Sequence, residues 1–502
     1  MKMPDRSAGI LMPITSLPAP FGTGDFGPEA RAFADFLSRG RQTYWQVLPL
    51  NPVDSGQDHS PYSAYSTMAG SPLLISPELL RDEGLLTDAD LESHQLPVEA
   101  LADFKAASQA KEALLRQAYQ NFQRQKTAEQ QADLDQFCLR EAYWLDDFAL
   151  YSALKQHYDQ PWYKWPKTYR SRQPKALITF AEQHRRALGY SKWLQHVFSR
   201  QWNGLRAYCH TLGIRLFGDL PFYASYDSVD VWAHPELFTL DETGAMTGIA
   251  GVPPDYFNAD GQLWNMPVFR WNVLKDKGYA WWIERLRKNM ELYDVLRLDH
   301  FRGFADYWEV PAGEPTAVNG AWKPGPGADF FRVLQTELGE LPFVAEDLGK
   351  INQAVYTLRD QFELPGMHVI QFAFGKDMPK SVNSLHHHTV NSIAYTGTHD
   401  NNTSRGWYRQ DEGQQQSKQL ERYVGLPVTE ENVHLILGRL TYASVAKLAI
   451  LPLQDVLGLD ESSRLNVPAT RGRNWLWRLL PGQLTPAVAP QLSEWTTVYH
   501  RY

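Results

Sequence analysis

Eight short apolar runs, each followed by a polar or glycine-rich turn, limit the possible folds of this chain more than any other feature. They are residues 9–14, 43–50, 213–223, 293–301, 341–349, 368–374, 392–401 and 448–457. Runs of this length that are bounded by turn residues predict buried β-strands. Several of the intervals between them carry helical patterns, and strands that alternate with helices predict a parallel sheet.

The segment GPEARAFADFLSRG shows how such a helical pattern begins and ends. Pro28 suits the first turn of a helix and Gly40 suits its end, while Phe33, Phe36 and Leu37 share one apolar face. Eight strands that alternate with helices of this kind predict a closed (β/α)8 (TIM) barrel of the α/β class. A doubly wound open sheet is the alternative, because a strand count from one sequence changes easily by one or two.

The chain has 502 residues, which is long enough for one large barrel with insertions. Residues 52–205, between the second and third runs, are far too long for a single crossover. They are rich in Ala, Gln, Leu and charged residues, so we expect a mainly helical inserted subdomain. Residues 1–502 are expected to form a single catalytic barrel unit around it.

Charge and cysteine content narrow the class of partners. The chain carries 49 Lys and Arg against 57 Asp and Glu, a net charge of −8, which argues against a nucleic-acid partner. Two cysteines, Cys138 and Cys209, form no disulfide framework and show no metal-ligand spacing. No run approaches the roughly 18 apolar residues that span a bilayer. We therefore expect a soluble cytoplasmic protein without a membrane partner, either a monomer or a weak homo-oligomer.

Four of the eight runs end in acidic residues, namely Asp219, Asp299, Glu346 and Asp400. The carboxyl ends of barrel strands lie on one face, where active sites are built, so we expect these four side chains to converge. One such acid alone is more often a loop or helix cap. Four converging carboxyl groups could either bind a divalent metal or carry out acid–base chemistry on a polyhydroxylated substrate.

Cleavage of a glycosidic bond needs one ionised and one protonated carboxyl group. In an extended strand Arg297 and Asp299 share one face, so the guanidinium favours the ionised form of Asp299 and suits it as the nucleophile. Glu346, which faces other negative groups in a partly dry pocket, is better placed to hold a proton. Its neighbour Asp347 should point to the opposite face and have a structural role. Asp400 is placed to hydrogen-bond sugar hydroxyls.

The segments GDLPFY, RLDHFRG, AEDLG and THDN, in this order, resemble the four signature regions of the α-amylase clan. The segments PITSLPAPFGTGDFG, HSPYSAYSTMAGSP, GVPPDYFNADGQLWNMP and RLNVPATRGRNWLWR are similar to those of the 4-α-glucanotransferases called amylomaltases or disproportionating enzymes. This resemblance covers about residues 8 to 478 and implies a (β/α)8 barrel; we expect no cofactor. It implies retaining transfer of α-1,4-glucan segments between maltodextrins, amylose or glycogen-derived glucans. Asp299 would be the nucleophile, Glu346 the acid/base and Asp400 the transition-state stabiliser.

The same resemblance assigns further residues to substrate binding at four places around the cleft. Ser60 and Tyr62 would bind on the acceptor side, and the donor-side glucose would contact Asp219, Arg297, His300 and His399. A covering loop formed by residues 241–275 would contribute Asp255, Phe257, Gln262 and Trp264. The far wall would contain Asn466 and Pro468. The glycines and prolines of the covering loop fit an irregular excursion over a cleft.

Two places depart from the family pattern. Met12 stands where a histidine is expected, which puts a first-strand substrate contact in doubt. The segment VPATRGRNW differs from the usual pattern of glycines after its proline, which puts the surroundings of Arg471 and Arg473 in doubt. The three catalytic acids are unaffected.

Two alternatives to the transferase stay open. An α-1,4-glucan hydrolase of the α-amylase type would use the same acids with a more open acceptor side. A catalytically silent glucan-binding protein is disfavoured by the intact acids. The run His386, His387 and His388 has the residue type of a transition-metal site, but three consecutive histidines lack the spacing of a closed one, so we expect no metal there.

Overall fold

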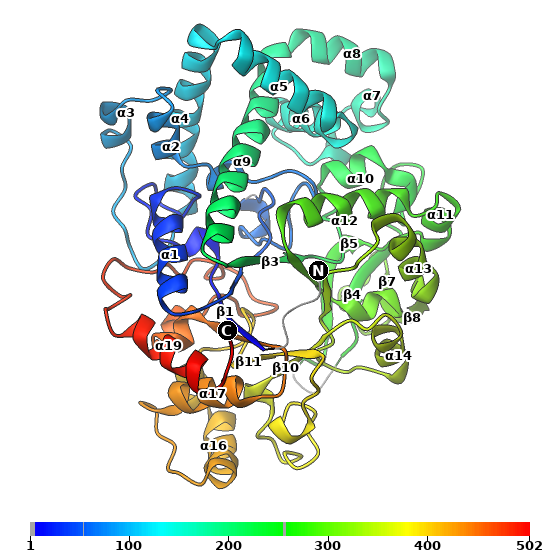
Figure 1. Cartoon of the computed structure of the whole chain (residues 1–502). Coiled ribbons are helices and arrows are strands. Elements are labelled where there is room, and N and C mark those ends of the chain that lie inside the picture. The colour runs from blue at the N-terminus through cyan, green and yellow to red at the C-terminus, as the bar shows by residue number, and fades with distance from the viewer. Residues whose placement is uncertain (1–5, 54, 255–257) are drawn as a thin grey trace.

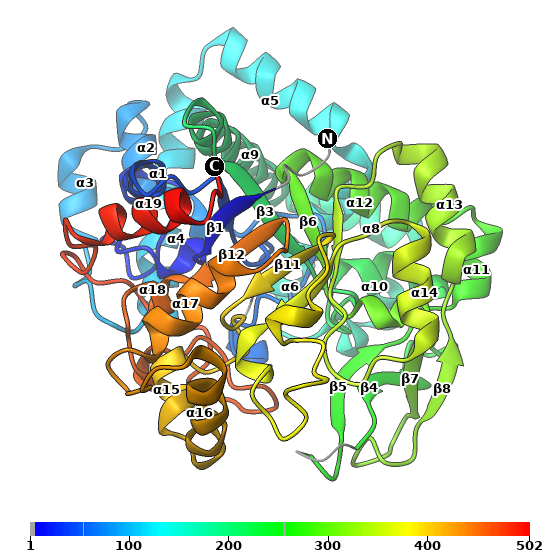
Figure 2. The same cartoon turned by 60° about the horizontal axis from the view of Figure 1, so that its bottom comes forward.

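Eight parallel strands form the centre of the computed structural model, which describes residues 6–53, 55–254 and 258–502 (Figures 1 and 2). The strands are β1 (Ser7–Leu11), β2 (Tyr44–Gln46), β3 (Arg215–Leu220), β6 (Val295–Leu298), β9 (Phe343–Ala345), β10 (Gly366–Val369), β11 (Ser392–Tyr395) and β12 (Leu448–Pro452). Each overlaps one of the eight apolar runs, so the prediction of eight strands is confirmed.

The eight strands curl into a nearly closed barrel. Neighbours pair in the order β10–β11–β12–β1–β2–β3–β6–β9, and every pair is parallel. The two outer strands of this order also meet, because the Ala345 N–H donates to the Pro365 carbonyl (2.8 Å) and the Met367 N–H donates to the Asp347 carboxylate (2.8 Å). The (β/α)8 barrel is therefore confirmed over the open sheet.

The first helix, α1 (Pro28–Arg39), has the predicted limits. Pro28 occupies its first turn, and the Gly40 N–H caps its end by donating to the Phe36 carbonyl. Phe33, Phe36 and Leu37 are buried against the barrel, as the apolar periodicity requires.

The described part of the connection between β2 and β3 contains eight α-helices. They are α2 (Pro77–Asp82), α3 (Asp88–Glu92), α4 (Phe104–Gln125), α5 (Ala128–Arg140), α6 (Ala142–Tyr158), α7 (Lys167–Arg170), α8 (Pro174–Gln183) and α9 (Arg185–Thr211). Most of them gather at the top of Figure 1, and α9 returns the chain to β3. The buried Lys111 ammonium contacts the buried Asp25 carboxylate (2.7 Å), which joins α4 to the loop after β1.

A second sheet of four antiparallel strands lies beside the barrel. Its strands, in the order β5–β4–β7–β8, are β5 (Gln262–Pro267), β4 (Gly248–Val252), β7 (Asp306–Pro311) and β8 (Ala321–Pro324). Residues 241–275, expected to be an irregular covering loop, therefore contain two strands. Gly251 explains the difference: it follows a register shift in β4, and a Cβ there would lie 2.3 Å from the Gln262 carbonyl oxygen. Glycine here permits a bulge and close approach of two strands instead of a loop.

The remaining α-helices complete the outer layer and the loops of the barrel. They are α10 (Val229–Ala233), α11 (Trp271–Asp276), α12 (Ala280–Leu292), α13 (Gly327–Leu338), α14 (Gln353–Gln361), α15 (Ser404–Arg409), α16 (Asp411–Val424), α17 (Val433–Ala443), α18 (Leu453–Val456) and α19 (Val488–Val498). Within the described part of the chain, none of the helices has the length and apolar character needed to cross a membrane.

Candidate active site

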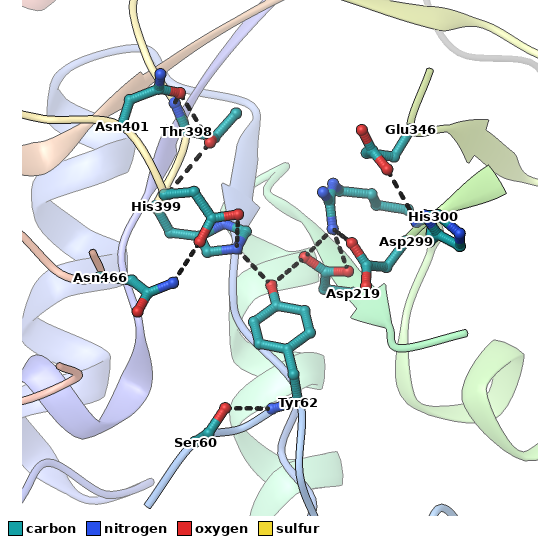
Figure 3. Close-up of polar contacts among 12 residues, drawn as sticks. Ser60, Tyr62, Asp219, Asp299, His300, Glu346, Thr398, His399, Asn401 and Asn466 are labelled. Carbon is teal, nitrogen blue, oxygen red and sulfur yellow. Dashed lines mark hydrogen bonds and ion pairs between the residues drawn. The ribbon is translucent and has the colours of Figure 1, made fainter. Parts of the chain in front are cut away.

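Strand register places the predicted acids at one end of the barrel. β3 and β6 pair Asp219 with Arg297, and β6 and β9 pair Leu298 with Ala345. The next residues along the chain, Asp299 and Glu346, therefore leave neighbouring strands at the same level. Figure 3 shows Asp219, Asp299 and Glu346 on one side of the site, with His399 facing them. This is the carboxyl end of the strands, where barrel enzymes place catalytic groups.

Arg297 connects two of the acids. Its buried guanidinium donates from Nη1 to both oxygens of Asp219 (2.8 and 2.9 Å) and to Oδ1 of Asp299 (3.0 Å). Burial lowers the pKa of Arg297, but the Asp219 and Asp299 carboxylates outweigh burial and raise it well above its usual value. The arginine therefore keeps its positive charge in contact with Asp299, in the arrangement that strand alternation predicted.

Glu346 is fixed from one side by the backbone. Its Oε2 accepts a hydrogen bond from the His300 N–H (2.9 Å), and its Oε1 accepts one from the Leu348 N–H (2.9 Å). Burial raises the pKa of Glu346 to about 7, with Arg297 opposing and Asp299 adding to the rise. A carboxyl group with this pKa holds its proton in a large fraction of molecules at neutral pH. Asp347 points elsewhere, to Arg359 and the Met367 N–H.

His300 adopts a left-handed backbone conformation (φ 48°), which turns its side chain against aromatic neighbours. Its ring meets the Trp264 ring edge to face, with centroids 5.0 Å apart. The Trp264 indole N–H donates to the Gln262 amide oxygen (3.1 Å). Gln262 and Trp264, both predicted in the covering segment, therefore lie together beside His300. Burial lowers the pKa of His300 to about 4, which keeps the imidazole neutral. Two more predicted residues of this segment, Asp255 and Phe257, lie outside the described residues.

Tyr62 stands between Asp219 and His399 (Figure 3). Burial raises the pKa of Tyr62 well above its usual value, so the phenol keeps its hydrogen and donates it to Asp219 Oδ2 (2.8 Å). The second contact of the phenol oxygen, with His399 Nε2 (2.8 Å), must then use a hydrogen on that nitrogen. Ser60 Oγ accepts from the Tyr62 N–H (3.3 Å). Tyr62, assigned by resemblance to the acceptor side, therefore also contacts the residues assigned to the donor glucose.

Asp400 lies in the loop that follows β11, next to His399. Its Oδ1 accepts from the Asn466 side-chain amide (2.6 Å), and its Oδ2 lies 3.4 Å from His399 Nε2. Its side chain is 42% exposed, which leaves room for a ligand to reach the carboxylate. Asn466, assigned by resemblance to the far wall, contacts the acid directly, whereas Pro468 lies exposed two residues farther along.

Sequence reasoning did not single out Trp475. Its ring centroid lies 5.7 Å from that of Tyr62 and 6.0 Å from that of His399. Its backbone is in the left-handed region (φ 67°), which is unusual for a bulky residue and is typical of functional sites. The sequence gives no sign of this left-handed conformation, because the surrounding segment NWLWR shows neither a strand nor a helix periodicity. Trp475 also lines a hollow whose walls include His59, Pro61 and Phe104.

The polar groups favour acid–base chemistry over a metal centre. A permanent cation, Arg297, already occupies the place between Asp219 and Asp299 that a metal would need. Among the residues that the structure describes, no group of three or more His, Cys, Asp and Glu side chains has metal-binding geometry. His387 and His388 have protein partners instead, the Pro379 carbonyl and the Ser444 hydroxyl respectively.

Comparison with known proteins places the chain in one family. A family model described as 4-alpha-glucanotransferase matches residues 12–484. The chain is 44% identical over 499 residues to a 4-alpha-glucanotransferase of Synechocystis, covering 99% of this chain and 98% of that protein. It is 43% identical over 493 residues to a 4-alpha-glucanotransferase of Thermus thermophilus, covering 97% of each. It superposes on an amylomaltase from Streptococcus agalactiae in complex with acarbose with a TM-score of 0.95, at 37% identity and 99% coverage of each chain. The chain therefore belongs to the 4-alpha-glucanotransferase family.

Proposed function

We propose that this chain is a 4-α-glucanotransferase that moves α-1,4-glucan segments between maltodextrins by a retaining double displacement. One observation carries the assignment of roles. Asp299 and Glu346 leave adjacent strands at the same level, one against a permanent cation and the other buried with a pKa of about 7. Two neighbouring carboxyl groups in such different environments suit a nucleophile and an acid/base.

The first step breaks the donor glycosidic bond. Asp299 attacks the anomeric carbon while Glu346 gives its proton to the departing 4-oxygen, so that a shortened glucan or glucose leaves and a β-glycosyl ester forms on Asp299. In the second step an acceptor 4-hydroxyl attacks that ester, its proton passes to Glu346, and Asp299 is released. The number of glycosidic bonds is unchanged, and chain lengths are redistributed. This mechanism requires the two carboxyl groups to lie roughly 5 to 5.5 Å apart.

The surrounding residues are proposed to hold the donor glucose. Asp219, Tyr62 and His399 form a hydrogen-bonded row that offers acceptors and donors to sugar hydroxyls. Asp400, exposed on one side, is proposed to bond ring hydroxyls more strongly as positive charge develops at the anomeric carbon. The amylomaltase of Streptococcus agalactiae was solved with acarbose, which supports a carbohydrate ligand in this cleft.

Preference for a sugar acceptor over water requires a sheltered intermediate. Trp264 beside His300 and Trp475 beside Tyr62 give the site aromatic surface on two sides. Aromatic faces suit the apolar faces of sugar rings and exclude water. This surface favours the transferase over the hydrolase alternative.

Pure maltotriose is expected to give a ladder of shorter and longer maltodextrins, including glucose, with little gain in reducing ends. Transfer conserves the number of glycosidic bonds, whereas hydrolysis adds one reducing end for each bond broken. Chromatography of the products together with a reducing-end assay measures both quantities. A product mixture that drifts to glucose and maltose with rising reducing ends would establish the hydrolase, and unchanged maltotriose would establish a binding protein.

The donor kcat/KM is expected to fall as pH rises through about 7. Glu346 must carry a proton to assist the departing oxygen, and its raised pKa of about 7 means that the protonated form is present below this value and lost above it. The rate constant should drop about tenfold per pH unit on the alkaline side. Initial rates with maltotriose between pH 5 and 9 test this, since donor kcat/KM reports the free enzyme. A profile that stays flat to pH 9 would contradict the acid role of Glu346.

A further inference from the structure

Residues 464–475, here called the clamp segment, form a loop whose two ends are tied together. The Trp475 N–H donates to the Leu465 carbonyl (2.6 Å), and the Val467 N–H donates to the Asn474 side chain (2.9 Å). At its exposed turn the Gly472 N–H donates to the Asp58 carboxylate (2.9 Å) in the loop that carries Tyr62. The clamp segment therefore spans the distance from Asp400 to the Tyr62 loop.

Arg464 makes two contacts that bracket Asp400. Its Nη2 donates to the Asp400 backbone carbonyl (2.7 Å), and its Nε donates to the Asn466 backbone carbonyl (2.7 Å). These are the two residues whose side chains meet, because the Asn466 amide donates to Asp400 Oδ1 (2.6 Å). One planar guanidinium thus fixes the backbones on both sides of the contact, and its rigid fork suits this double role.

The contact with Asn466 orients the Asp400 carboxylate. Oδ1 is occupied by the amide, whereas Oδ2 lies 3.4 Å from His399 Nε2 on a partly exposed side chain. Without the bridge, the Asp400 loop and the clamp segment would each be free to shift, and the amide would no longer select one rotamer of the acid. A misplacement of about 1 Å in a catalytic group costs on the order of 100-fold in rate.

We propose that Arg464 is a positioning residue for Asp400, acting through Asn466 to aim the free carboxylate oxygen at the donor glucose. Arg464 does this from the backbone side, since both of its hydrogen bonds go to carbonyl oxygens. The proposal rests on the role of Asp400 given above. It assigns to the clamp segment a part in transition-state stabilisation in addition to its part in the wall of the cleft.

Arg464→Gln is expected to lower kcat on maltotriose by about 10- to 100-fold while KM changes less than about threefold, because geometry and not binding is lost. Arg464→Lys should recover part of the rate, since an ammonium replaces the charge and one hydrogen bond but not the planar fork. Arg405→Gln is the matched control. Arg405 also donates to a backbone carbonyl, that of Gly458 (2.9 Å), and pairs with Glu430, but it does not contact Asp400. Its loss should lower Tm without a comparable fall in kcat.

A double-variant cycle with Asn466→Ala separates positioning from general destabilisation. If Arg464 acts through the contact between Asn466 and Asp400, the double variant loses no more kcat than the more damaged single variant. Losses that multiply, or an Arg464→Gln enzyme with the kcat of the parent, would overturn the inference. If the Gln variant does not fold, Arg464→Lys takes its place in the same cycle and is judged in the same way. Asp400→Asn keeps the two failures distinguishable: normal activity there would refute the role of Asp400, whereas an inactive Asp400→Asn beside a normal Arg464→Gln refutes only the positioning role.

Discussion

Asp299→Asn is expected to remove transfer activity almost completely, by on the order of 10⁴-fold or more, while the protein stays folded. An amide cannot form the glycosyl ester, so the first step has no nucleophile. The structural cost should be small, because the Asp299 side chain is 28% exposed and Asn keeps an oxygen that can accept from Arg297. Initial rates of glucose release from maltotriose and a thermal unfolding curve measure the two effects.

Asp294→Asn provides a matched control at the other end of the same strand. Asp294 precedes β6 and accepts hydrogen bonds from Arg206, His210 and the Leu216 N–H. The amino end of a barrel strand serves stability and not catalysis, so this variant should lose Tm and keep kcat. An Asp299→Asn enzyme that keeps most of its turnover, or a control that loses as much, would refute Asp299 as the nucleophile.

The barrel could be predicted from the sequence because its strands are buried on both faces. Every residue of β1, β2, β6 and β9 through β12 is buried, so the strands read as mainly apolar runs between turns even though a few contain a polar residue, such as Arg297 in β6. The second sheet was not predicted. β4 has the sequence GIAGV, whose glycines read as loop residues, and β8 is exposed along its whole length, so neither shows a strand pattern.

The acids of the site could be predicted because each lies near the carboxyl end of its strand: Asp299 and Glu346 directly follow β6 and β9, Asp219 is the second-last residue of β3, and Asp400 lies in the loop after β11. Alternation along β6 also predicted that Arg297 would reach Asp299. Contacts made by loops had no such basis. Tyr62 lies 157 residues from Asp219 and 337 from His399, and no local period connects such positions.

Met12, where the family pattern has a histidine, is fully buried, and its backbone carbonyl accepts from the Trp45 indole (2.8 Å).

Glu346→Gln should separate the acid/base from the nucleophile through its dependence on the leaving group. With maltotriose the departing sugar oxygen needs a proton, so the first step should slow by about 10²- to 10⁴-fold. With α-maltosyl fluoride the departing fluoride needs little protonation, so Asp299 should still be glycosylated. The second step then lacks its base, and the glycosyl enzyme should accumulate, as intact-protein mass spectrometry would detect.

Asp347→Asn tests whether this behaviour belongs to Glu346 alone. Asp347 is the next residue, but it accepts from Arg359 and the Met367 N–H on the side that closes the barrel, so its loss should lower Tm without any dependence on the leaving group. Azide, a nucleophile that needs no base, should release the trapped sugar from Glu346→Gln and restore turnover of the fluoride. One result would refute the acid/base role: the Glu346→Gln enzyme is slowed equally with the fluoride and with maltotriose, and no glycosyl enzyme accumulates. Glu346 would then not be the group that transfers the proton, although burial raises its pKa.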